Sequence, residues 1–199
     1  AYLIGEKLLG YNKNSTIINE IRDLLCIGTV ADMAPIIGAN KYWLRQYLKL
    51  ITNTKNLGLK CILKLSGLEN KDINSEDIGF KIAPRINAVG RLADPKKVIE
   101  LFLESEYKYA IEIARELEIL NSNRKTIVDG IVIEARAIID SNKKNIPPFI
   151  LLAQEHWHQG VIGIVASRIL DIYNRPTAIL TGNKQDSFTG SVRSNGTFS

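Results

Sequence analysis

The chain has 199 residues, of which 45% are hydrophobic and 24% charged, proportions that are typical of globular proteins and exclude a disordered or fibrous chain. No apolar run approaches the roughly 18 residues needed to cross a bilayer, and no charged-then-apolar leader opens the chain, so we expect no membrane segment. The 26 basic and 21 acidic side chains give a net charge of +5, which favours a polyanionic partner without proving one.

Two further counts bear on the origin of the chain. Met33 is the only methionine, so we treat the chain as a piece of a longer protein. Cys26 and Cys61 stand alone without CxxC spacing, which favours buried free thiols over a disulfide or zinc ligands. A reducing cytoplasm is the compartment that this cysteine usage predicts.

In the first half of the chain, apolar residues at three- and four-residue spacing predict helices. These helices fall at residues 2–10, 17–27 and 43–51, with shorter pieces around Leu59–Leu65 and Asp77–Ile82. A turn is expected at Pro35–Gly38, and loops over the rest of residues 53–80, because Asn, Gly, Ser and Asp punctuate them.

The second half begins with a turn-rich stretch at residues 84–92, after which Asp94 and Pro95 have the types expected at a helix N-cap and first turn. A long helix is predicted from Ala110 to Ile138, as a connector between lobes. Strands are predicted at 149–153, 176–180 and 189–192, with a helix over 160–173. This strand, helix, strand order predicts an α/β unit with a parallel pair of strands.

Four segments carry residue types suited to chemistry. In GTVAD (residues 28–32), Asp32 follows an apolar helix beside small residues. It is either a ligand of a cation such as Mn²⁺ or Mg²⁺, or the cap of a helix or turn ahead of Pro35. The chain has only two histidines, so any partner ligands are expected upstream of residue 1.

The segment PRINAVGRL (84–92) contains Arg85, Asn87 and Arg91. An arginine fork matches phosphate oxygens bidentately, and an asparagine adds a neutral donor. The alternative is a pair of surface arginines that bridge to acids such as Asp77 or Asp94. If the segment is extended, Arg85 and Asn87 point the same way.

HWHQGVIG (156–163) lies between a predicted strand and the start of a helix, where free N–H groups and the helix dipole attract anions. Its two histidines are alternatively a surface pair, and a zinc site is disfavoured because no further ligand stands nearby. Trp157 is expected in the core more than as a platform for a base.

The last segment is GSVRS (190–194). In an extended strand, Ser191 and Arg193 point to one face and Val192 to the other, so a hydroxyl and a guanidinium converge as in a phosphate clamp while the valine anchors the core. The alternative is an ordinary half-exposed strand.

Taken together and in order, five motifs resemble the signature series of the RecJ exonucleases, a family of the DHH phosphoesterase superfamily. The motifs are GTVAD (28–32), PRINAVGRL (84–92), LNSNR (120–124), WHQGVIGIVASRI (157–169) and GSVRS (190–194). The resemblance runs from about Ala1 to Ser194, and five ordered motifs are far more specific than any one of them.

The resemblance implies a role for individual residues. Asp32 matches the aspartate of the family's last metal motif, and is therefore expected to be catalytic and to bind Mn²⁺ or Mg²⁺. The residues that it implies as DNA- or phosphate-binding are Arg85, Asn87, Arg91, His158, Gly190, Ser191, Arg193 and Ser194. His156 lies just outside the matching stretch and receives no role.

The implied fold is α/β: the C-terminal part of a DHH domain (1–55), a helical connector with a phosphate-facing loop (56–145), and the N-terminal part of a DHH-associated domain (146–199). The Asp-His-His triplet and the earlier aspartate motifs are absent, so the chain alone is expected to be inactive. Met33-Ala34 stands where the family usually has an aliphatic pair, a mild departure.

For the intact protein, the resemblance implies a metal-dependent exonuclease that degrades single-stranded DNA from the 5′ end in DNA repair and recombination. We expect the intact protein to be a monomer in the cytoplasm. One alternative is a phosphoesterase of short oligonucleotides or cyclic dinucleotides, which shares the metal chemistry. Another is a catalytically silent single-strand-binding relative. Ser191 and Arg193 favour the exonuclease over the first alternative, and Asp32 argues against the second.

Overall fold

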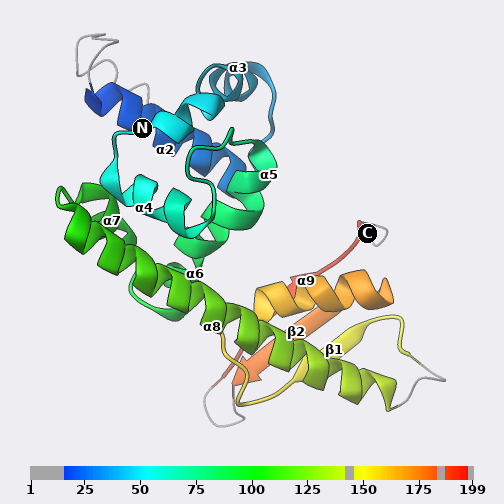
Figure 1. The fold of residues 1–199 in the computed structure, drawn as a ribbon. Helices are drawn as coiled ribbons and strands as arrows, with labels where there is room; N and C mark the ends of the chain where they lie inside the picture. The colour runs from blue at the N-terminus through cyan, green and yellow to red at the C-terminus, as the bar shows by residue number, and fades with distance from the viewer. Residues whose placement is uncertain (1–15, 142–145, 183–186, 197–199) are drawn as a thin grey trace. The chain divides into compact units, whose positions relative to one another are not determined.

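The computed structural model describes residues 16–141, 146–182 and 187–196 (Figure 1). The chain divides into two compact units, Ala1–Asn121 and Ser122–Ser199. The helix predicted at residues 2–10 lies outside the described residues. None of the described helices is long and apolar enough to cross a membrane.

The first unit is built from helices. In chain order its elements are α2 (Thr16–Ala31), α3 (Gly38–Tyr47), the 3₁₀ segment η1 (Leu48–Asn53), α4 (Leu57–Leu65), α5 (Ser75–Asp77), the π-helical segment η2 (Ile78–Ile82), α6 (Ala83–Leu92), α7 (Lys96–Leu103) and the first part of α8 (Tyr107–Asp140). The helices predicted at 17–27 and 59–65 are therefore confirmed. The segment predicted as one helix at 43–51 is divided between α3 and η1, and the segment at 77–82 is mainly the π-helical η2.

The core of this unit collects the apolar faces of α2, α4, α7 and α8. Leu59, Leu101 and Leu117 are among its fully buried side chains. Cys26 and Cys61 are buried free thiols within it, as predicted. Burial raises the pKa of the Cys26 thiol to about 12, so this group stays protonated and behaves as a small apolar side chain.

Asn56 joins α4 to α7. Its side-chain oxygen accepts a hydrogen bond from the N–H of Leu59 at 2.9 Å, which caps the start of α4. Its side-chain nitrogen donates to the carbonyl of Phe102 at 2.7 Å, near the end of α7. A single buried amide therefore satisfies backbone groups in two helices.

The close approach of α4 to α7 makes Gly58 sensitive to substitution. A Cβ at this position would lie 2.2 Å from the carbonyl oxygen of Leu101, which is backbone and has little freedom to move. We expect Gly58→Ala to destabilise the chain by roughly 3 kcal/mol in urea denaturation, because overpacking against backbone forces the helices apart. Gly130→Ala, in a helix where a Cβ meets nothing within 4 Å, is the matched control and should stabilise by up to about 1 kcal/mol. Equal effects of the two substitutions would contradict this packing.

The structure contradicts the prediction for residues 84–92. This segment was expected to be turn-rich, yet it forms α6. Pro84 stands in the first turn, where its fixed φ and missing N–H suit a helix, and Ala88 and Val89 are fully buried on the inner face. The next helix, α7, starts at Lys96, and Asp94 accepts a hydrogen bond from the Lys96 N–H at 2.9 Å as a capping side chain.

The long helix predicted from 110 to 138 is confirmed as α8, which runs for 34 residues. The boundary between the two units falls inside it. Ala110, Ala114 and Leu117 are buried in the first unit, while Val128 and Ala135 are buried in the second. The apolar face of one continuous helix thus contributes to both cores.

The second unit contains the remainder of α8, the strands β1 (Ile150–Ala153), β2 (Thr177–Gly182) and β3 (Phe188–Arg193), and the helix α9 (Ile162–Tyr173). The strand order is β1-β2-β3, with β1 and β2 parallel as predicted and β3 antiparallel to β2. The fully buried Ile179 lies opposite Ser191 in the register, so these two side chains share one face of the sheet.

The prediction that Val192 anchors the core is wrong, because Val192 lies on the other face of the sheet and is largely exposed. Val192 lies opposite Ala178, which in turn lies opposite Leu151, so the three side chains share this face. Val192 is 59% exposed and Leu151 58% exposed. The alternation along β3 is as expected, but the face that carries Ser191 and Arg193 is the one that packs toward α9 and its buried residues.

Candidate phosphate-binding and metal-binding residues

Asp32 lies in an exposed turn directly after α2. Its N–H donates to the carbonyl of Gly28 at 3.0 Å, and Met33 follows with a left-handed φ of 53°, a common way to end a helix. The turn therefore presents the carboxylate at the helix end. Within the described residues, no group of three or more His, Cys, Asp or Glu side chains is placed to hold a metal ion. Asp32 thus has the right oxygen chemistry for a hard cation, as one ligand of a set.

The helical form of α6 separates the residues that were predicted to act together. On a helix, positions four apart share a face, so Asn87 and Arg91 lie together on an exposed side. Arg85 points elsewhere: its Nε donates to a carboxylate oxygen of Glu118 on α8, and one terminal nitrogen donates to the carbonyl of Lys81. Arg85 does bridge to an acid, but the acid is neither Asp77 nor Asp94.

The loop between β1 and α9 is held by a carboxylate of α8. One oxygen of Glu134 lies 2.9 Å from the indole N–H nitrogen of Trp157, which donates to it, and 2.9 Å from Nε2 of His156. These two hydrogen bonds, that of Trp157 foremost, lower the pKa of the Glu134 carboxyl below its usual value. Trp157 is 2% exposed and belongs to the core, as predicted.

Ser191 and Arg193 converge on the first turn of α9. A Cβ added to Gly163 would lie 3.1 Å from the Ser191 hydroxyl oxygen and 3.2 Å from a terminal nitrogen of Arg193. The absence of a side chain at Gly163 therefore lets a hydroxyl and a guanidinium approach a helix N-terminus. Backbone N–H groups in the first turn of a helix lack intrahelical partners and favour anions. These three elements together have the chemistry of a phosphate site.

The other predicted residues of this unit surround the same region less closely. His158 is exposed, and its Nδ1 accepts a hydrogen bond from the N–H of Gly160 at 3.1 Å. Ser194 is exposed just after β3. Gly190 faces the opposite side of the sheet, where a Cβ would lie 2.1 Å from a methyl carbon of Leu180. A side chain at position 190 would therefore require the half-buried Leu180 side chain on β2 to move.

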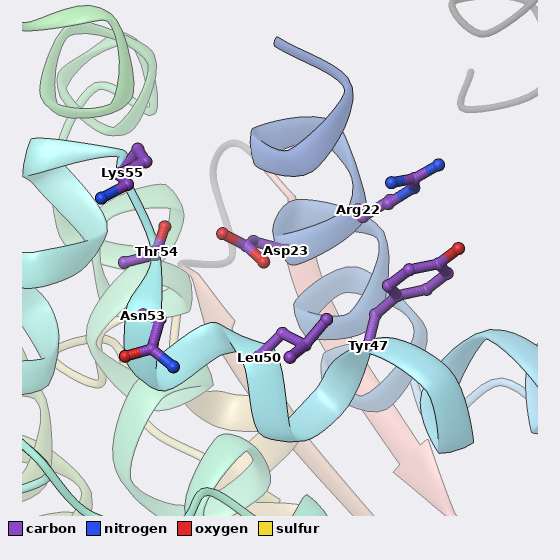
Figure 2. A pocket seen from close by; sticks show the side chains of 7 residues that line it. All are labelled: Arg22, Asp23, Tyr47, Leu50, Asn53, Thr54 and Lys55. Carbon is purple, nitrogen blue, oxygen red and sulfur yellow. The ribbon is translucent and has the colours of Figure 1, made fainter. Parts of the chain in front are cut away.

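A separate cavity of about 190 Å³ lies in the first unit, between α2 and η1 (Figure 2). It is lined by Arg22, Asp23, Tyr47, Leu50, Asn53, Thr54 and Lys55. The Arg22 guanidinium lies over the Tyr47 ring, 4.7 Å from its centroid. Asp23 is 6% exposed, and burial raises the pKa of its carboxyl to about 6, although a hydrogen bond with Thr54 opposes the shift.

This buried carboxyl predicts an unusual pH dependence. The folded pKa of about 6 exceeds the usual value of 3.8, so between these values the folded chain holds the proton while the unfolded chain has lost it. Asp23 therefore lowers stability as the pH rises from 4 to 6. We expect Asp23→Asn, whose amide oxygen still accepts from Thr54, to raise the free energy of unfolding at pH 7 by roughly 2 kcal/mol and to leave it unchanged near pH 4. Urea denaturation at both pH values measures this. A loss of stability at pH 7 would mean that Arg22 or Lys55 compensates the charge.

Known proteins resemble this chain in sequence and structure. Over 195 residues it is 33% identical to the single-stranded-DNA-specific exonuclease RecJ of Bacillus subtilis, covering 98% of this chain and 24% of that protein. Over 179 residues it is 37% identical to the protein of the same name from Haemophilus influenzae, covering 88% of this chain and 31% of the relative.

The comparison of folds finds the same relatives as the comparison of sequences. The crystal structure of RecJ from Thermus thermophilus in complex with Mn²⁺ superposes with a TM-score of 0.76 at 32% identity, covering 88% of this chain and 25% of that one. A second crystal structure of the same protein contains Mg²⁺ and also has a TM-score of 0.76. The chain is therefore similar in sequence and in fold to a segment of the RecJ exonucleases.

No protein-family model matches the chain. The chain spans about a quarter to a third of the length of the curated RecJ relatives that it matches. The region aligned with the Bacillus subtilis protein includes the motifs GTVAD, PRINAVGRL and GSVRS.

The sequence pattern predicted no role for two acidic residues of the chain. Glu118 engages Arg85 from 33 positions away, and Glu134 engages His156 and Trp157 from 22 and 23 positions away. Both lie on α8, whose surface carries many charged residues, so nothing in the local pattern singles them out. His156, which received no role, is one of the residues that hold the loop.

Proposed function

We propose that the full-length protein is a metal-dependent exonuclease that degrades single-stranded DNA from its 5′ end, in DNA repair and recombination. The observation that supports this most directly is the convergence of Ser191 and Arg193 on the first turn of α9. The relatives from Bacillus subtilis and Haemophilus influenzae carry the name single-stranded-DNA-specific exonuclease. A hydroxyl, a guanidinium and a helix N-terminus together suit a phosphate.

In this proposal Ser191 and Arg193 hold a phosphate at the 5′ end of the strand. His158 in the β1–α9 loop and Ser194 just after β3 are both exposed, and they contact the adjoining DNA backbone. Phosphate contacts fix the position of a strand but carry no sequence information. The enzyme is therefore expected to act on single strands of any sequence and to bind them less tightly as the salt concentration rises.

The residues of α6 have distinct roles in this scheme. Asn87 and Arg91 contact the DNA backbone directly from the exposed face of the helix. Arg85 contacts a phosphate with the part of its guanidinium that does not engage Glu118 and Lys81. A planar guanidinium has five N–H donors, so these two acceptors leave donors for a further anion.

Asp32 is the proposed catalytic metal ligand of this chain. Its carboxylate would hold Mn²⁺ or Mg²⁺, the cations present in the Thermus thermophilus crystal structures, together with ligands outside the described residues. When bound, such a cation neutralises charge at the scissile phosphate and lowers the pKa of its bound water. The exposed turn after α2 leaves the carboxylate accessible for this role.

The domain assignment is also a proposal: residues 1–55 complete a DHH domain, 56–145 form a helical connector, and 146–199 begin a DHH-associated domain. We further propose that the full-length protein acts as a monomer in the cytoplasm. Because these 199 residues lack the Asp-His-His triplet and the earlier aspartate motifs, we propose that they are inactive alone.

An assay of the full-length protein tests the function. An oligonucleotide with a 5′-phosphate and a 3′ fluorescent label is incubated with the protein and Mn²⁺ or Mg²⁺, as a single strand and as a blunt duplex. We expect 3′-labelled products that shorten progressively from the single strand only, and no reaction after chelation of the metal. Immediate release of the label, or equal degradation of the duplex, would contradict the proposal.

A further inference from the structure

Glu134 is the only acceptor that the structure provides for the indole N–H of Trp157 within the described residues, and the same oxygen contacts His156. Both contacts are 2.9 Å long. An ionised carboxylate makes stronger hydrogen bonds than a neutral acceptor, and the lowered pKa of Glu134 keeps it ionised at neutral pH. The loop between β1 and α9 is thereby attached to α8.

The same loop is attached to the sheet from its other side. The hydroxyl of Thr181 on β2, itself buried, donates to the carbonyl of Trp157 at 2.7 Å. Trp157 is therefore held by its side chain and by its backbone, through two different elements. A tryptophan fixed in this way has little freedom to rotate, because both restraints and the surrounding core must yield together.

Only a short stretch of chain separates Trp157 from the first turn of α9. In that stretch Nδ1 of His158 accepts a hydrogen bond from the N–H of Gly160 at 3.1 Å, and the carbonyl of His158 accepts one from the N–H of Val161 at 3.1 Å. These local bonds make the segment a tight turn. A displacement of Trp157 is consequently transmitted to Gly163, the residue against which Ser191 and Arg193 lie.

We propose that Glu134 is a positioning residue that, through Trp157 and His156, holds the β1–α9 loop so that the first turn of α9 completes the 5′-phosphate site with Ser191 and Arg193. This inference rests on the proposed function, because it assigns a phosphate to that site. Glu134 itself does not contact the phosphate. Its effect on binding comes from the geometry of the loop, and not only from the stability of the fold.

The chain contains two tryptophans, Trp43 in the first unit and Trp157 in the second, which allows the loop to be observed directly. With 5-fluorotryptophan incorporated, ¹⁹F NMR reports both side chains, and the Trp43→Phe spectrum assigns them. The probe is a short 5′-phosphorylated single-stranded oligonucleotide, compared with its 5′-hydroxyl twin. We expect the phosphorylated strand to shift the Trp157 resonance, and Trp43 serves as the reference.

Substitutions of Glu134 then separate positioning from stability. In Glu134→Ala, the dissociation constant for the phosphorylated strand should rise about tenfold, the size expected for loss of a charged hydrogen bond, and approach that of the 5′-hydroxyl twin. Glu134→Gln keeps an oxygen that accepts from Trp157 and should restore most of the affinity. Asp129→Ala is the matched control, because it removes an ion pair between the same helix and Arg168 of α9 but does not contact the loop. It should bind as the wild type does.

The outcomes are distinguishable. If the wild type binds both strands equally, the 5′-phosphate site is absent, and the role proposed above for Ser191 and Arg193 fails with it. If the wild type discriminates and Glu134→Ala does so equally well, the positioning role is wrong while the function stands. Thermal denaturation shows whether Glu134→Ala is folded. If it is not, Trp157→Phe replaces it as the test, because this substitution removes the same hydrogen bond from the other side and keeps an aromatic ring. Its affinity, measured by fluorescence anisotropy of a labelled oligonucleotide, should fall similarly, and wild-type affinity would overturn the proposal.

Discussion

Replacing Asp32 with alanine in the full-length protein is expected to abolish hydrolysis of single-stranded DNA while leaving the protein folded. Loss of a residue that only orients a metal ligand typically costs about 10- to 100-fold in activity or metal affinity, and loss of a ligand itself should exceed that range. Asp32 is exposed in the turn after α2, so its removal disturbs no packing. The measurement is the initial rate with a 5′-phosphorylated strand over a range of Mn²⁺ concentrations.

The matched control for this prediction is Asp72→Ala, which removes another exposed aspartate from the same unit. It should retain the wild-type rate and metal dependence. Activity in Asp32→Ala that excess Mn²⁺ restores fully would show that Asp32 contributes to metal affinity alone. Activity equal to that of the control at every metal concentration would refute a catalytic role for Asp32.

Arg193→Ala should weaken binding of a 5′-phosphorylated single strand by roughly 10- to 100-fold, since a hydrogen bond to a charged group contributes about 1.5–3 kcal/mol. The guanidinium lies against the first turn of α9, where it adds to the attraction of the helix N-terminus for an anion. Binding of the 5′-hydroxyl twin should change much less. Fluorescence anisotropy with both strands in the full-length protein provides the comparison.

Arg175→Ala offers a matched control, because it removes the same charge from an exposed arginine that follows α9 rather than facing its first turn. It should lower affinity slightly and equally for both strands, as a general electrostatic effect. The salt dependence separates the two variants further, since a lost phosphate contact reduces the slope of log affinity against log salt. An Arg193→Ala protein with wild-type affinity for the phosphorylated strand would remove the clamp from the proposed function.

Several elements could be predicted because their pattern is local. The helices α2, α4 and α8 follow from the spacing of apolar residues, and the parallel pair β1 and β2 follows from the strand, helix, strand order. The side chains of Ser191 and Arg193 share a face because residues two apart in a strand always do. For these features the determining information lies within a few neighbouring residues.

The prediction of a turn-rich stretch failed at α6. At residues 84–92 the proline and glycine indicated turns, whereas the structure is the helix α6. Proline is compatible with a helix only in its first turn, and that is where Pro84 lies. Burial of Ala88 and Val89 against the rest of the unit decided the outcome, and burial depends on residues far away in the sequence.

The sequence by itself determined the order of the elements, the faces of β3 and the RecJ motifs, because periodicity and motif spacing are properties of the chain. Only the tertiary structure decided which of those faces is covered, leaving Val192 exposed and Ser191 beside Gly163. It also decided the partners of the charged groups, such as Glu118 for Arg85 and Glu134 for Trp157. The reason is that a hydrogen bond between residues more than twenty positions apart is selected by the packing of whole helices, which no local pattern encodes.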